Sequence, residues 1–225
     1  MSEFPEREIF CMHGRLYTKY EVERLQTQTM DLTLADILSF FLNGSVNAFE
    51  EVLRRLVSAL EAVGLRYCIA GRSAVVIYGR PIRTGTIDLL VEPNYEGIAS
   101  LLRNLERAGS HDINYGHLTV LTDTPLRIDL IPAFQKGQIM QLEGAVKLRV
   151  GAVDARVSRI DDLIPGLLKY GRYEDALYLL VNYQGEIDAE RMQTLASMIG
   201  VERQLNRAIE EYRLLMKKTC REPLI

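Results

Sequence analysis

A stretch in the second quarter of the chain constrains its fold more than any other part. The apolar run Tyr67–Ala70 is typical of a short buried strand, and Gly71 follows it as a turn residue. Ser73–Tyr78 suits a short buried helix, and Thr86–Val91 indicates a second strand, which carries the single carboxylate Asp88. A strand, a glycine turn, a short helix and a second strand together predict an α/β domain.

The flanking pattern extends this prediction. Apolar spacing predicts helices around 34–41, between Asn47 as a cap and Gly64, and at 95–108, and strands at 117–121, 126–131, 146–150 and 155–157. Past about residue 159 the pattern becomes helical, at 163–170, 173–183, 189–199 and 201–217. We therefore expect an N-terminal extension at 1–44, an α/β (α+β) core with a small mixed sheet and flanking helices at 45–158, and a helical C-terminal region at 159–225.

Composition narrows the class of protein. The net charge of −3 gives no general reason to expect nucleic acid, so DNA is not an expected partner. Three cysteines without metal-ligand spacing suit a reducing compartment. The sequence shows neither a signal-peptide pattern nor an apolar run of about 18 residues, so we expect a cytoplasmic protein without a membrane partner.

Two carboxylates are candidates for metal chemistry. Phosphoryl transfer relies on positioned phosphates and divalent metal, and magnesium is held by a few carboxylates plus phosphate oxygens. Asp88 lies on one expected strand, and Asp129 lies on another, in Arg-Ile-Asp-Leu-Ile-Pro. The turn at Gly71 could supply backbone N–H groups to a triphosphate. Asp88 and Asp129 are therefore the candidate catalytic and metal-binding residues.

These residues occur in an order that resembles the minimal nucleotidyltransferases, in particular the group that includes abortive-infection toxins. The likeness covers 67–183, about half of the chain, and it rests on Gly71 and Ala74, Gly79-Arg80-Pro81, Arg83-Thr84, Asp88, Asp129 and the segment Ser158–Asp175. It implies a nucleotidyltransferase-like fold, magnesium, an NTP, and a protein or RNA acceptor. The candidate nucleotide-binding residues that it implies are Gly71, Arg72, Ser73, Arg83 and Thr84.

Three positions depart from that family pattern. Arg72 replaces the second Gly or Ser of the phosphate turn, and Thr86 replaces the first metal-binding Asp. Leu167 falls where a lysine is expected, although Lys169 is close by. A neutral hydroxyl is a poor ligand for a hard dication, so the metal site is expected to be degenerate. Our hypothesis is that the Arg72 guanidinium points toward Asp88 and Asp129 and takes the place of the lost metal.

Simpler interpretations of the same residues stay open. Asp88 could cap a turn or pair with Arg83, Thr84 could serve a plain turn, and Arg80 and Arg83 could be solvated loop arginines. Three functions follow: a nucleotidyltransferase-fold protein that is weakly active or inactive and acts by binding nucleotide or a partner, an active magnesium-dependent transferase, and an antitoxin-like or assembly domain without enzymatic activity. The oligomeric state is left open.

Overall fold

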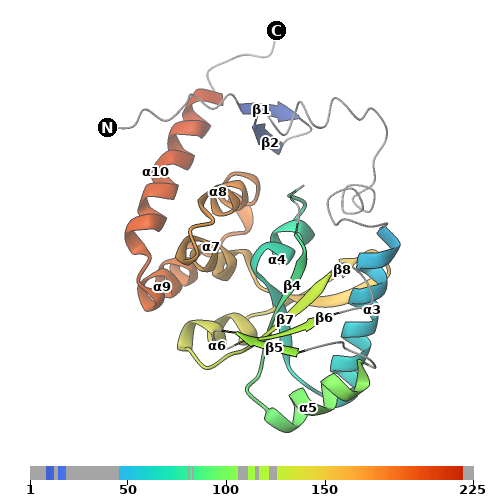
Figure 1. Ribbon diagram of the computed structural model, residues 1–225. Helices are drawn as coiled ribbons and strands as arrows, with labels where there is room; N and C mark the ends of the chain where they lie inside the picture. Colours follow the sequence, from blue (N-terminus) through green and yellow to red (C-terminus); the bar gives the residue numbers. More distant parts are fainter. Residues whose placement is uncertain are drawn as a thin grey trace.

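A computed structural model gives the fold (Figure 1), and it describes residues 9–12, 15–18, 46–80, 82, 84–105, 111–114, 117–121 and 126–219. The strands are β1 Ile9–Met12, β2 Arg15–Thr18, β3 Tyr67–Ala70, β4 Thr86–Val91, β5 His111–Asn114, β6 His117–Leu121, β7 Arg127–Pro132, β8 Val146–Val150 and β9 Val153–Val157. The helices are α3 Val46–Val63, α4 Gly71–Ile77, α5 Tyr95–Asn104, α6 Lys136–Glu143, α7 Ile160–Lys169, α8 Tyr173–Asn182, α9 Ala189–Ile199 and α10 Glu202–Thr219, with a 3-10 turn at Gln184–Glu186.

A mixed seven-stranded sheet forms the centre of the molecule, in the order β5-β6-β7-β4-β3-β9-β8. The central pair β4 and β7 runs parallel, as does the pair β3 and β9, and the remaining neighbours are antiparallel. The small mixed sheet that the sequence predicts is therefore confirmed. A separate hairpin of β1 and β2 lies beside α8.

The two faces of the sheet carry different residues, because successive side chains on a strand point to opposite sides. Ile87 and Leu89 belong to the large core cluster, which α3 and α5 supply from one face. Cys68 and Leu90, a cross-strand pair, belong to a smaller cluster with Leu142 of α6 on the other face. Asp88 alternates with Leu89 and therefore shares the face of α6.

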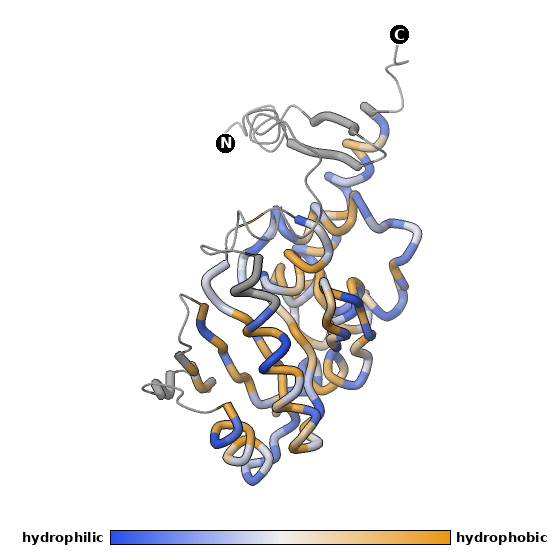
Figure 2. Tube along the Cα trace, turned by 90° about the vertical axis from the view of Figure 1, so that its right-hand side faces the viewer, coloured by the Kyte–Doolittle hydropathy of each residue, from blue (hydrophilic) through white to orange (hydrophobic). Residues whose placement is uncertain are grey.

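The large core cluster also joins the sheet to the C-terminal helices. It includes Ala74 and Val75 of α4 together with Leu163 and Ile164 of α7, and α4 packs against α7 and α8. Figure 2 shows the hydrophobic segments gathered where the helices and strands face one another. The expected core at 45–158 and the expected helical region beyond it thus share one hydrophobic interior.

A buried ion pair fixes the helical region to the edge of α6. Asp162 of α7 is fully buried and accepts hydrogen bonds from Nε and Nη2 of Arg191 in α9, each at 2.8 Å. The same Arg191 donates to the carbonyl of Met140 in α6. Burial raises the pKa of Asp162, and the bonds from Arg191 oppose that rise. One carboxylate and one guanidinium therefore connect three helices.

Most elements confirm the sequence prediction, with differences at particular residues. α3 already includes Asn47, so Asn47 is not its cap, and α5 ends at Asn104 rather than at 108. α6 and β5 were not predicted. α6 has no clear apolar stripe, and its Gly137 packs so closely on α9 that an added Cβ would lie 2.7 Å from Ile199. The helix expected around 34–41 lies outside the described residues.

Candidate active site

The structure brings Asp88 and Asp129 together on adjacent strands. They are register partners in the parallel pair β4 and β7, so both side chains leave the same face of the sheet. Thr119 of β6 is the register partner of Asp129 and donates a 2.7 Å hydrogen bond to its Oδ1. The pairing of two carboxylates that the sequence indicated is therefore present in the fold.

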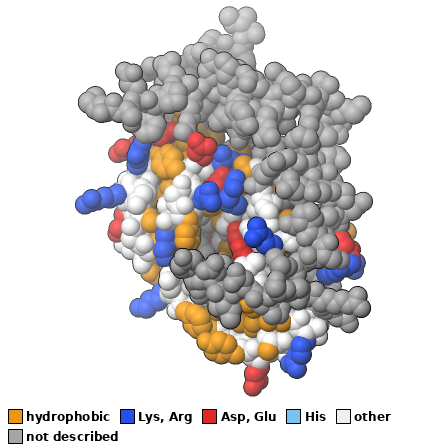
Figure 3. Space-filling model, in the orientation of Figure 1, with side chains coloured by type: hydrophobic (Ala, Val, Ile, Leu, Met, Phe, Trp, Pro, Cys, Tyr) orange, Lys and Arg blue, Asp and Glu red, His pale blue; other side chains and the backbone are white. Residues whose placement is uncertain are grey.

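Both carboxylates are only partly covered. Further along β4, Leu90 is buried in the small cluster with Leu142 of α6 and Ala133. Asp88 and Asp129, nearer the start of their strands, remain partly exposed. In Figure 3, acidic and basic side chains gather in the middle of the face seen in Figure 1. The site is thus the part of the sheet face that α6 leaves accessible, next to α4.

Asp88 is bonded to the first turn of α4 as well as facing the site. Its Oδ2 accepts from the backbone N–H of Arg72 at 3.2 Å, and its Oδ1 accepts from the Thr86 hydroxyl at 3.4 Å. Its own N–H donates to Oγ of Ser73, which in turn donates to the carbonyl of Ala70. Asp88 therefore caps the turn, as the simpler interpretation proposed, and this role is compatible with its place beside Asp129.

Gly71 is required by this close contact. Its φ is +56°, which disfavours residues that have a Cβ. A Cβ built at this position would lie 2.1 Å from Oδ2 of Asp88, far inside van der Waals contact. The glycine thus allows the carboxylate to approach the start of α4.

The Asp88 carboxyl has an elevated pKa. Burial raises it from 3.8 to about 6, and the Asp129 carboxylate adds to the rise. The N–H of Arg72, the hydroxyl of Thr86 and the Arg72 charge act in the opposite direction. Desolvation and a like charge therefore outweigh the favourable contacts, and at neutral pH the ionised pair is under electrostatic strain.

The hypothesis that Arg72 pairs with Asp88 and Asp129 is not what the structure shows. Its ion pair is with Asp175 of α8, where Nε of Arg72 lies 3.6 Å from Oδ2. Only the backbone of Arg72 is bonded to Asp88. The α8 carboxylate, buried against α4, draws the guanidinium toward the helical region.

Arg80 also differs from its simplest interpretation, because it is not a solvated loop arginine. It is buried, forms a short ion pair with Oδ1 of Asp175, and lies 3.8 Å from Glu174. Its guanidinium carbon lies 5.6 Å from the centre of the Tyr178 ring, within cation–π range. Burial raises the pKa of Asp175, although Arg80 and Arg72 oppose the rise.

The other residues that the sequence singled out either make structural contacts or lie outside the described residues. The Thr84 hydroxyl donates to the carbonyl of Thr86 at 2.9 Å, which is a turn role. Lys169 donates to Oε1 of Gln135, ahead of α6, and Leu167 is buried. Arg83 lies outside the described residues.

The donor set fits one magnesium ion better than two. Asp88 and Asp129 give two facing carboxylates, which matches the one or two that magnesium uses together with substrate phosphates. Thr86 occupies the same strand face two residues before Asp88 but offers a hydroxyl. Among the described residues, no group of three Asp, Glu, His or Cys side chains could hold a metal ion.

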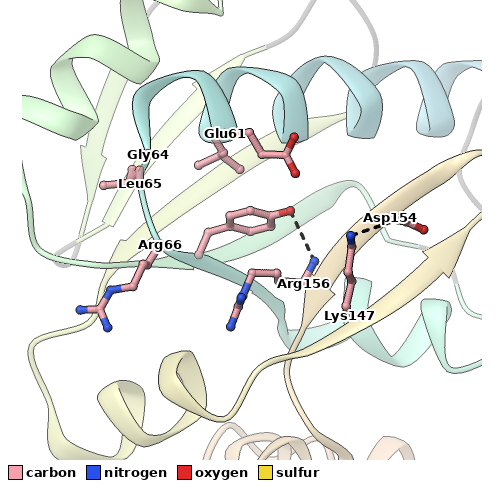
Figure 4. A pocket seen from close by; sticks show the side chains of 9 residues that line it. Glu61, Gly64, Leu65, Arg66, Lys147, Asp154 and Arg156 are labelled. Atoms are coloured by element: carbon pink, nitrogen blue, oxygen red, sulfur yellow. Dashed lines mark hydrogen bonds and ion pairs between the residues drawn. The ribbon is translucent and has the colours of Figure 1, made fainter.

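A separate pocket of about 330 Å³ lies between the end of α3, the start of β3 and the β8–β9 hairpin (Figure 4). The Tyr67 hydroxyl accepts a hydrogen bond from the backbone N–H of Arg156 there, and Lys147 pairs with Asp154 at 3.5 Å. Tyr67 alternates with Cys68 on β3, so its side chain leaves the sheet on the face away from Asp88. It contributes no residue to the carboxylate pair.

Comparison by sequence finds no relative of this chain, whereas comparison by structure finds several. No family model matches the chain, and no curated protein matches it by sequence. The solution structure of the antibiotic-resistance factor ANT(2'')-Ia matches with a TM-score of 0.52 and 15% identity, over 74% of this chain and 97% of that one. A crystal structure of ANT(2'')-Ia in complex with adenylyl-2''-tobramycin gives 0.50 and 14%, over 68% and 97%.

A nucleotidyltransferase-like antigenic protein from Paracoccidioides brasiliensis matches with a TM-score of 0.47 and 16% identity, over 72% of this chain and 93% of that one. The chain therefore has the nucleotidyltransferase fold that its sequence motifs resemble. Among the described residues, no helix is both long and apolar enough to cross a membrane.

Proposed function

We propose that this chain binds a nucleoside triphosphate beside Asp88, Asp129 and the start of α4, and that its metal site is degenerate, so nucleotidyl transfer is weak. The observation that carries the proposal is the register pairing of Asp88 with Asp129, with the Thr86 hydroxyl where a third carboxylate would share their face. The fold supports the nucleotide, since ANT(2'')-Ia, a structural neighbour, has been captured with an adenylyl product.

Asp88 and Asp129 are the residues that would hold magnesium. A bound magnesium ion would neutralise the two carboxylates and attract phosphate oxygens. Thr86 limits this site, because its hydroxyl carries no charge and already donates to Asp88. Asp88 in turn is shared between the site and the first turn of α4. Both features support weak transfer to the protein or RNA acceptor that the sequence resemblance implies.

Restoring the missing carboxylate tests the proposal. We expect Thr86→Asp to raise magnesium-dependent transfer of labelled nucleotide at least tenfold over the unmodified chain. Thr86→Asn is the matched control, because it has nearly the same size without the charge and should give no gain. Asp88→Asn in the Thr86→Asp background should abolish the gained activity, which excludes a contaminating enzyme.

Two outcomes would decide against the proposal. If the unmodified protein shows clear magnesium-dependent transfer at the same rate as Thr86→Asp, its present site is a fully active transferase. Absence of any thermal shift with NTP, with or without magnesium, would favour an interaction domain. Saturation at 100 times the dissociation constant stabilises a protein by roughly 2.7 kcal/mol, so binding would be readily detected.

A further inference from the structure

Two arginines beside the candidate site share one buried carboxylate. Arg72 at the start of α4 and Arg80 after α4 both pair with Asp175 of α8. We propose that Arg72, positioned by Asp175, binds a phosphate group of the nucleotide, so that nucleotide binding persists without a divalent cation. This inference rests on the proposed nucleotide site and gives Arg72, already a candidate nucleotide-binding residue, a phosphate contact that does not depend on metal.

The backbone of Arg72 fixes its distance from the site. Its N–H is bonded to Oδ2 of Asp88, so the side chain starts directly beside the carboxylate pair. The chain then runs toward α8, where Nε meets Asp175 at 3.6 Å. A phosphate that reaches the exposed part of this side chain would leave the carboxylates in place on their strands.

The donor atoms of Arg72 are incompletely used. Its Nε is buried, and it has no hydrogen-bond partner, since Asp175 lies beyond hydrogen-bond distance. Within the described part of the chain, its terminal nitrogens donate no hydrogen bond, and 35% of the side chain is exposed. An arginine fork with open donors suits bidentate contact with phosphate oxygens. The Asp175 contact thus holds the guanidinium in place, while its hydrogen-bond donors stay available to a ligand.

The local charge also favours an anion. Of the two arginines that pair with Asp175, Arg72 has the longer contact, at 3.6 Å. Asp175 is committed to the shorter pair with Arg80, which leaves the Arg72 charge the less compensated of the two.

The experiment measures ATP affinity by calorimetry in EDTA and in magnesium, for the unmodified chain, Arg72→Ser and Arg72→Lys. We expect the unmodified chain to lose no more than about tenfold in affinity when magnesium is removed. Arg72→Ser should lose at least a further tenfold in EDTA, and Arg72→Lys should recover part of that loss. Arg66→Ser is the control: Arg66 pairs with Glu92, its side chain is 67% exposed, and it lines the separate pocket near the β8–β9 hairpin.

Asp175 is tested as a positioning residue through a double-mutant comparison. Asp175→Asn should weaken binding in EDTA in the unmodified background and have no further effect in Arg72→Ser. A purely structural role would weaken both equally and would overturn the positioning role.

The two proposals fail in different ways. If ATP binds only with magnesium, and with the same affinity in Arg72→Ser as in the unmodified chain, this inference is overturned and the proposed function stands. Absence of ATP binding under both conditions overturns the proposed function and the inference with it. Inorganic tripolyphosphate that competes with ATP in the unmodified chain but not in Arg72→Ser would support the phosphate contact.

Discussion

Asp88 should make the folded protein less stable at neutral pH than at mildly acidic pH. Its pKa is about 6 in the folded state, against 3.8 ordinarily, so folding favours the protonated form. The cost of ionising it therefore appears as pH rises from about 4 to about 6 and is fully present above that range. The displaced pKa corresponds to roughly 3 kcal/mol, and partial exposure of the carboxyl reduces the expected effect to about 1–2 kcal/mol.

Asp88→Asn removes this cost, since the amide carries no charge and its oxygen can still accept from Arg72. We expect the variant to be about 1–2 kcal/mol more stable than the unmodified chain at pH 7.5 and no more stable at pH 4. Urea unfolding followed by circular dichroism between pH 4 and 8 measures the difference. Glu210→Gln, on the exposed surface of α10, controls for net charge. Equal pH slopes for Asp88→Asn and the unmodified chain between pH 4.5 and 6.5 would refute the reasoning.

Three further predictions concern the turn, the buried ion pair and the metal. Gly71→Ala should lower the melting temperature by several degrees, because its Cβ would meet Asp88 at a positive φ; an unchanged melting temperature would contradict the contact. Arg191→Leu should cost about 3–5 kcal/mol in urea unfolding, and adding Asp162→Asn should restore part of it, because the uncompensated buried charge disappears. Magnesium binding at pH 6 should release protons from Asp88, seen by calorimetry in two buffers of different ionisation enthalpy and lost in Asp88→Asn.

The strands and the carboxylate pair could be predicted because their signals are local. Tyr67–Ala70 is a continuous apolar run that Gly71 ends, and Thr86–Val91 is apolar apart from Thr86 and Asp88. The apolar neighbours of Asp129, Ile128 and Leu130, already indicated that its side chain faces a polar site or the surface.

The partner of Arg72 could not be predicted in the same way. Asp175 lies far along the sequence, and the pair forms only because α4 packs against α8. The sequence resemblance had marked Asp175 as part of a family segment without indicating its partner. Likewise, the buried state of Arg80 depends on Tyr178 and Asp175 of α8, which no local pattern around Gly79 shows.

The contact between Gly71 and Asp88 changes how glycine should be weighed when such domains are compared. In this chain a Cβ at position 71 would clash with Asp88 at a positive φ, so the glycine serves the fold whether or not the chain transfers nucleotides. Retention of the glycine among related chains would therefore report on folding and would not distinguish active members from silent ones. Position 86 has no such structural obligation beyond a 3.4 Å hydroxyl contact, so it is the informative position for sorting relatives by activity.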